Sequence, residues 1–184
     1  MKKSIIASLV ALGVVSGLAQ AADHDVTFQG SVTTVTCDLD VSGAGVNGNL
    51  PNMVDLGQAK IGDVDSGKVV DFVFKPSQTA GNQAACDAMD ASKAATLTWF
   101  GSTFDGNGLG KTGGTAEGAH VKLMATNATS ANNSQPVTAS GTAHEFSAGN
   151  LKTGGDGLKY SAQLIPGATA GSFEAVARYA LSYK

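Results

Sequence analysis

The chain has 184 residues and a formal net charge of −3 at pH 7, with 12 basic and 15 acidic side chains. The basic residues form no stripe or cluster, which argues against a nucleic-acid partner. Its 24 glycines would be compatible with a low-complexity chain. The apolar residues between them recur with a period of two, however, which indicates strands joined by turns.

The first 21 residues have the pattern of a secretory signal. Lys2 and Lys3 are followed by the mostly apolar stretch 5–18 and by the small-x-small sequence Ala19-Gln20-Ala21. The apolar stretch is shorter than the roughly 20 residues that a membrane-spanning helix needs. We therefore predict cleavage before Ala22, which leaves 163 residues, 10 basic and 15 acidic. That length suits a single domain with its own core.

Residues 22–34 contain the first alternating run of the exported chain. Val26, Phe28, Gly30 and Val32 fall on one face, with polar residues between them. Such a segment is either the first strand of its own sheet or a strand that is added to the sheet of another copy. The pattern alone does not decide between the two.

Cys37 and Cys86 are the two cysteines. An exported protein folds in an oxidising compartment, so we predict that they form a disulfide. The alternative is a pair of buried free thiols.

The remaining alternating runs predict an all-β fold in residues 35–184. They are 69–74, 97–99, 121–125, 160–164 and 173–183, and the glycine-rich stretches between them include 42–49, 105–118, 127–135 and 153–157. Residues 84–95 are the one segment with helix propensity, and form either a short helix or a loop with one helical turn. Seven or so short strands with such turns indicate an immunoglobulin-like β-sandwich.

The last run leaves the predicted sandwich incomplete. Residues 173–183 carry apolar or small side chains on one face, and only Lys184 follows them. An edge strand is normally protected from further pairing. If the fold stops at this strand, the core beneath it is open until a strand from another chain covers it.

No motif of catalysis or metal binding is convincing. His24, His120 and His144 lack partners at metal-ligand spacing, and Gly110-Lys111-Thr112 lacks the earlier glycine of a phosphate-binding loop. The segment 63–67 has Gly67 where a calcium loop needs an oxygen ligand. We predict a protein that is not an enzyme and that needs no metal or cofactor.

Several features together resemble the subunits of chaperone–usher pili. Four of them are the exported start, the alternation 26–32 shortly before Cys37, the segment Val54-Asp55-Leu56-Gly57-Gln58 and a second cysteine after a Val/Phe-rich strand. The other two are at the C-terminus, where Tyr183 is penultimate and Gly171 is the fourteenth residue counted from the end. The resemblance covers nearly the whole chain.

The resemblance implies a bacterial surface fibre whose subunits pass through the periplasm. A periplasmic chaperone would cover the open groove, and the outer-membrane usher would replace it with the N-terminal strand of the next subunit. Val26, Phe28, Gly30 and Val32 would then be the donor residues. The acceptor groove and chaperone-binding surface would comprise Gly171, Phe173, Ala175, Ala177, Tyr179, Leu181, Tyr183 and Lys184. After removal of the signal only a few residues precede Val26, so the N-terminal extension is short at the outermost donor contact.

The size of the chain favours a shaft subunit over a tip adhesin, because no room is left for a second, receptor-binding domain. The resemblance further suggests a major subunit, with loops 105–118 and 127–135 as candidates for binding a host glycan. The alternative from another class is a closed, monomeric β-sandwich that binds carbohydrate. Sparse aromatic residues argue against that alternative.

Overall fold

The computed structural model describes residues 37–43, 46 and 52–184. These residues belong to one compact unit. The predicted signal and the predicted donor residues Val26, Phe28, Gly30 and Val32 lie outside the described residues. The described structure therefore begins at Cys37.

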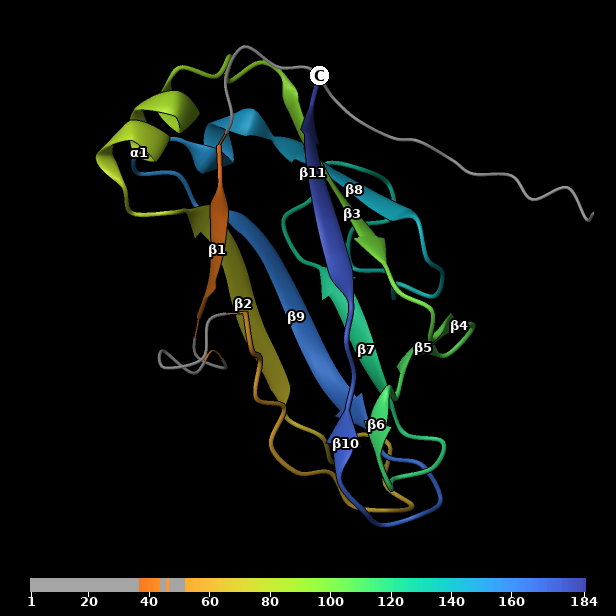
Figure 1. Cartoon of the computed structure of the whole chain (residues 1–184). Coiled ribbons are helices and arrows are strands. Elements are labelled where there is room, and N and C mark those ends of the chain that lie inside the picture. Colours follow the sequence, from red (N-terminus) through yellow and green to blue (C-terminus); the bar gives the residue numbers. More distant parts are fainter. Residues whose placement is uncertain (1–36, 44–45, 47–51) are drawn as a thin grey trace, which may run out of the picture. The chain divides into compact units, whose positions relative to one another are not determined.

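The first sheet has six strands, and all of its pairings are antiparallel. In order across the sheet they are β1 (Leu39–Ser42), β2 (Val69–Pro76), β9 (Leu158–Ile165), β7 (His120–Ala125), β5 (Gly108–Gly110) and β4 (Phe104–Asp105) (Figure 1). Side chains alternate between buried and accessible along β2 and β7, because successive side chains of a strand point to opposite faces. The alternation in the sequence therefore placed these two strands correctly.

The second sheet has three strands, in the order β11 (Arg178–Tyr183), β3 (Ala94–Phe100) and β8 (Thr142–Ser147). A separate two-stranded pair joins β10 (Phe173–Glu174) to β6 (Gly113–Gly114). The pairings of β11 and β8 with β3 are also antiparallel. The last predicted strand is thus divided, with β10 and β11 separated by residues 175–177.

The core between the two sheets is centred on Tyr160. Its ring lies 5.8 Å from that of Phe72, 5.4 Å from that of Trp99 and 5.7 Å from that of Phe146, measured between ring centroids. Each aromatic side chain buries a large apolar area, and offset or edge-to-face pairs add to that contribution. The result is an all-β, immunoglobulin-like sandwich, as predicted, and no strand of the described residues covers its β1–β11 side.

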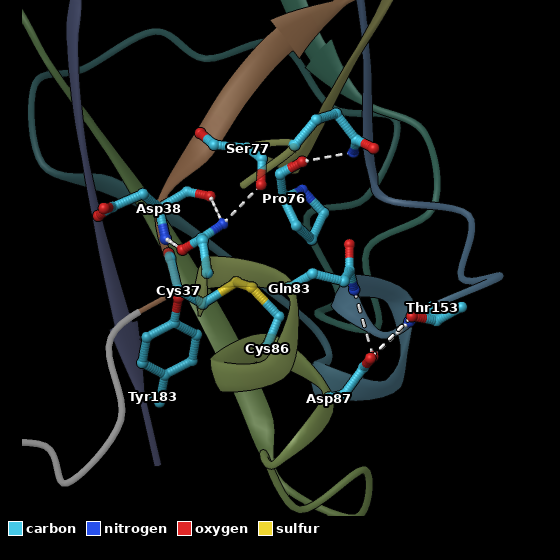
Figure 2. Close-up of a disulfide and its surroundings, with 11 residues drawn as sticks. Cys37, Asp38, Pro76, Ser77, Gln83, Cys86, Asp87, Thr153 and Tyr183 are labelled. Carbon is cyan, nitrogen blue, oxygen red and sulfur yellow. Dashed lines mark hydrogen bonds between the residues drawn. A yellow bond between two sulfur atoms is a disulfide. The ribbon is translucent and has the colours of Figure 1, made fainter. Parts of the chain in front are cut away.

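A disulfide joins Cys37, just before β1, to Cys86 in helix α1 (Ala80–Asp87) (Figure 2). The predicted pairing is therefore present, and both cysteines are buried. Helix α1 begins four residues earlier than the segment with helix propensity, and β3 already starts at Ala94. The 3₁₀ helix η1 (Ala148–Leu151) follows β8.

Five strands were not predicted from the sequence. Three of them, β4, β5 and β6, are two or three residues long and lie in or beside the stretch 105–118, which was predicted as a loop. Strand β1 is only four residues long, and β8 contains the polar residues Thr142, His144 and Glu145. His144 nevertheless points into the core, where it is fully buried. A period-two search for apolar residues misses a strand in which a histidine occupies a core position.

Candidate functional site

The candidate site is a groove between β1 and β11, the edge strands of the two sheets. Each of these strands has one sheet neighbour among the described residues. They lie beside each other in Figure 1, drawn in orange and dark blue. Two hydrogen bonds join them at one end: the Tyr183 hydroxyl donates to the Cys37 carbonyl at 2.9 Å, and the Tyr179 hydroxyl donates to the Leu39 carbonyl at 3.2 Å.

Beyond these bonds the two strands leave an apolar groove with a volume of about 180 Å³. Its base is the core itself, where Phe72, Phe74 and Trp99 line the groove although each is at most 6% exposed. The lining residues are Val41, Asn52, Val54, Leu56, Phe72, Phe74, Trp99, Leu109, Val121, Leu123, Ala162, Ala175, Ala177 and Tyr179. A groove that opens directly onto core aromatics suits the alternate side chains of an added strand.

The inner face of the last strand is only half covered. Ala175, Ala177, Tyr179, Leu181 and Tyr183 are all partly accessible, although they pack against the core. Strand β3, which pairs with β11 in the same sheet, buries its inner residues: Leu97 is 0% exposed and Trp99 is 6% exposed. A contiguous apolar surface of this kind marks an interaction site or a liability for aggregation.

Strand β1 forms one wall of the groove, and hydrogen bonds in the region around the disulfide hold it in place. The amide of Asn82 accepts from the Asp38 backbone N–H at 2.6 Å and donates to the Asp38 carbonyl at 2.9 Å. Asp87 accepts from the backbone and side chain of Thr153 at 2.6 and 2.7 Å, which ties α1 to the chain before β9, as Figure 2 shows. These contacts keep β1 in place although, among the described residues, only one of its edges is paired.

Burial raises the pKa of Tyr183 above its ordinary value, and the nearby Asp38 carboxylate adds to the effect. Burial also raises the pKa of Tyr179, with smaller contributions from Asp40 and Asp38. Both hydroxyls therefore keep their protons at neutral pH and remain donors to the carbonyls of Cys37 and Leu39.

The predicted acceptor residues occupy different places. Ala175, Ala177 and Tyr179 line the groove, while Phe173, Leu181 and Tyr183 pack against the core beside it. Gly171 lies at a neighbouring cavity of about 850 Å³. Lys184 donates its backbone N–H to the carbonyl of Ala94.

The opposite wall was not predicted from the sequence. Val41, Val54 and Leu56 line the groove, and the alternation of Val54 and Leu56 was the one signal that could have shown it. The neighbouring cavity shares Val54, Leu56, Val121 and Ala175 with the groove. Met53, Ile61 and Val176, which line that cavity, are about half exposed.

Gly171 is needed for close packing. A Cβ atom there would lie 2.2 Å from the Thr115 Oγ1 and 2.8 Å from the Ala116 N. The Ser172 carbonyl accepts from the backbone N–H groups of both residues, at 2.9 and 3.0 Å, so this contact cannot widen without breaking hydrogen bonds. The glycine allows the segment before β10 to approach the chain that follows β6.

We expect Gly171→Ala to lower the free energy of unfolding by about 1–3 kcal/mol, because the added methyl group overpacks this contact. Urea unfolding of the purified domain measures the change. Gly106→Ala is the matched control, since a Cβ there meets nothing within 4 Å. Equal stabilities of the two variants would contradict the packing role of Gly171.

A buried polar pair lies deeper in the core. The Tyr160 hydroxyl lies 3.1 Å from the His144 Nδ1, and both residues are 0% exposed. Burial lowers the pKa of His144 below its ordinary value of 6.5 and raises that of Tyr160. The histidine is therefore neutral in the folded domain at neutral pH.

This pair predicts an acid-sensitive domain. Unfolding restores the ordinary pKa of His144, so the unfolded chain binds more protons once the pH falls below about 6.5. We expect the free energy of unfolding to be level above pH 7 and to decrease from about pH 6.5 toward pH 5. Urea unfolding across this range measures it. His144→Asn should flatten the decrease and His120→Asn should keep it; an unchanged slope in His144→Asn would contradict the assignment.

Two further features of the described residues concern metal binding and membrane crossing. No group of three His, Cys, Asp or Glu side chains in residues 37–43, 46 and 52–184 is placed to hold a metal ion. Nor does any helix in these residues have the length and apolar character needed to cross a membrane.

Comparison with known proteins identifies the family. The chain is 32% identical over 184 residues to the F107 fimbrial protein of Escherichia coli, with all of both chains covered. It belongs to the same family of fimbrial proteins. The K99 fimbrial protein of Escherichia coli is 31% identical over 169 residues, covering 89% of this chain and 84% of that protein. No family model matches the sequence.

Two solved pilus structures are also similar to this fimbrial subunit. The P pilus rod subunit PapA has a TM-score of 0.47 and 20% identity, covering 87% of this chain and 99% of that one. A chaperone–usher pilus studied for the uncoiling of its rod has a TM-score of 0.46 and 18% identity, covering 89% and 96%.

Membership of the family confirms three of the predictions. The chain is a structural subunit and not an enzyme, and it is assembled into fimbriae on the outside of the bacterium. The enzyme is the interpretation that the family excludes.

Proposed function

We propose that this fimbrial subunit polymerises by donor-strand exchange, with residues 22–34 of one copy filling the groove between β1 and β11 of the next. The observation that carries the proposal is the half-covered inner face of β11 opposite an edge of β1 that no described strand pairs with. Main-chain pairing with the edge of β11 would supply affinity, and alternate side chains entering the groove would supply specificity.

The donor segment matches the groove in length and in pattern. Ten residues, 25–34, span about 33 Å when extended, and the inner face of the last strand extends over the eleven residues from Phe173 to Tyr183. Val26, Phe28 and Val32 would enter the apolar groove, and Gly30 would lie where little depth is available. In this proposal residues 1–21 are a cleaved signal and residues 35–184 form the pilin domain.

Before assembly the chaperone would cover the same groove, in contact with Ala175, Ala177, Tyr179 and the C-terminal Lys184. An uncovered groove would leave its partly accessible apolar lining, Ala175, Ala177 and Tyr179, open to water and to other subunits. Strand exchange then replaces one apolar partner by another, which requires no nucleotide. Once the inserted strand is paired along its length, its dissociation is slow.

The experiment uses the chaperone-bound subunit lacking residues 22–34, mixed with a synthetic peptide of residues 25–34. We expect the peptide to displace the chaperone and give a stable, monomeric domain, whereas the subunit with its own segment forms fibres. A Phe28→Arg peptide should fail, and a Gln29→Arg peptide, altered on the other face, should work. Equal displacement by both altered peptides would overturn the proposed register.

We further propose that this is a major, shaft-forming subunit, because one chain of this size would carry both a donor segment and an acceptor groove. Any contribution to host adhesion through a glycan would fall to loop 105–118. The polar side chains of loop 127–135 are largely engaged within the domain. Glycan binding by purified fimbriae, compared before and after substitution of Asn107, tests this role.

A further inference from the structure

The sandwich has a second side at which its two sheets end. There β7, in the first sheet, pairs with the short β5 through Val121 and His120 only, and β8 is the outer strand of the second sheet. The remaining edge of β7 and the whole outer edge of β8 would be available to an added strand. Residues 128–137, which we call the closing segment, lie along both edges.

The closing segment occupies the free edge of β8. The Thr129 backbone N–H donates to the Glu145 carbonyl at 2.7 Å, and its hydroxyl donates to the same oxygen at 3.0 Å. The Glu145 N–H donates to the Ser130 Oγ at 3.2 Å, and the Asn132 amide donates to the Ala143 carbonyl at 2.9 Å. The edge groups of Ala143 and Glu145 that these bonds use are therefore not free for another strand.

The same segment then covers the rest of β7. The backbone N–H groups of Ser134 and Val137 donate to the carbonyls of Ala125 and Leu123, both at 2.8 Å. The Val137 side chain is 0% exposed, so the segment also places an apolar side chain in the core. Pro136, which forms a bridge with Met124, has no N–H and cannot extend pairing outward.

The segment is braced internally and at its start. The Ser130 hydroxyl donates to the Asn132 Oδ1 at 2.6 Å, and the Ala128 N–H donates to the Asn133 Oδ1 at 2.9 Å. Just before it, Asn127 donates to the Gly157 carbonyl at 2.9 Å and accepts from the Lys159 N–H at 2.7 Å. Side-chain hydrogen bonds thus hold an irregular segment where a regular strand would leave a new free edge.

We infer that the closing segment is a built-in guard that blocks the β7–β8 side and so restricts strand addition to the groove between β1 and β11. It does within one chain what an added strand does at the groove: it bonds to exposed edges and inserts an apolar side chain between the sheets. The polar residues of this loop serve the direction of assembly and not the binding of a ligand.

The first test is amide hydrogen exchange of the full chain in complex with its chaperone. We expect the N–H groups of Thr129, Ser134, Val137 and Glu145 to exchange at least about a hundredfold more slowly than in an unfolded chain. Rapid exchange at Glu145 and Thr129 would overturn the inference. This outcome does not depend on donor-strand exchange, so it remains informative if the proposed function fails.

The second test is the double variant Ser130→Ala/Asn132→Ala in the same complex. We expect exchange at Glu145 and Thr129 to rise at least about tenfold, and light scattering to detect species larger than the one-to-one complex at rising concentration. The matched control is Ser102→Ala/Asn107→Ala, since both residues are exposed. Faster exchange without larger species would overturn the guarding role, as would no change in either measurement. If the variant does not fold, the amide hydrogen exchange of the natural chain in the first test decides whether the inference holds.

Discussion

Ala177→Asp is expected to abolish fibre formation while leaving the domain folded. Ala177 lines the groove and points toward the space that the donor strand would fill. A carboxylate there would be buried against apolar donor side chains without a partner, at a cost of about 3 kcal/mol or more, which corresponds to at least about a hundredfold loss in affinity for the donor peptide. Electron microscopy of the bacteria and peptide binding to the purified domain are the measurements.

Ala180→Asp is the matched control for this variant. Ala180 lies three residues later, in β11, and its side chain is exposed, so the same charge is added outside the groove. We expect normal fibres from Ala180→Asp. Loss of fibres in both variants would show that β11 tolerates no charge for reasons of folding, and normal fibres in both would exclude the groove as the docking site.

Removal of the disulfide is expected to have the second largest effect. The bond between Cys37 and Cys86 closes a loop with a sequence separation of 49. The chain-entropy model gives a loss of about 4 kcal/mol for a loop of this length, a large fraction of the stability of a single domain. Because Cys37 directly precedes β1, the loss would also loosen one wall of the groove.

Urea unfolding of Cys37→Ala/Cys86→Ala, compared with the natural chain with and without reductant, tests this expectation. The midpoint of the variant should match that of the reduced natural chain and should not shift further when reductant is added. In the bacterium the variant should be degraded before it reaches the fibre. A midpoint equal to that of the oxidised chain would contradict a stabilising role for the bond.

The architecture illustrates how a subunit can be stable enough to fold and still unfinished. Its core is centred on Tyr160 and its closing segment protects the β7–β8 side, so most of the sandwich needs no partner. The opening is confined to the side of β1 and β11, where Ala175 and Ala177 supply small side chains and therefore room. In the proposed assembly, specificity for one kind of added strand would follow from leaving one side open and guarding the other.

The sequence by itself determined the fold class, the disulfide and the last strand. Alternation along residues 69–74, 121–125 and 173–183 is a local property, because the period of a strand is two wherever the strand lies. The two cysteines in an exported chain required no spatial information either. The family resemblance added the expected donor and acceptor segments, and sequence relatives confirm the family.

Only the tertiary structure decided which residues face each other across the groove. Val41 and Leu56 are far from Ala177 in the chain, and pairing of β1 with β2 and of β11 with β3 brings them to one opening. The buried His144 and the bonds of Ser130 and Asn132 to β8 were likewise invisible in the sequence, where these residues look like those of any polar loop. Their roles depend on long-range pairing, and a one-dimensional pattern does not record which distant backbone groups remain to be satisfied.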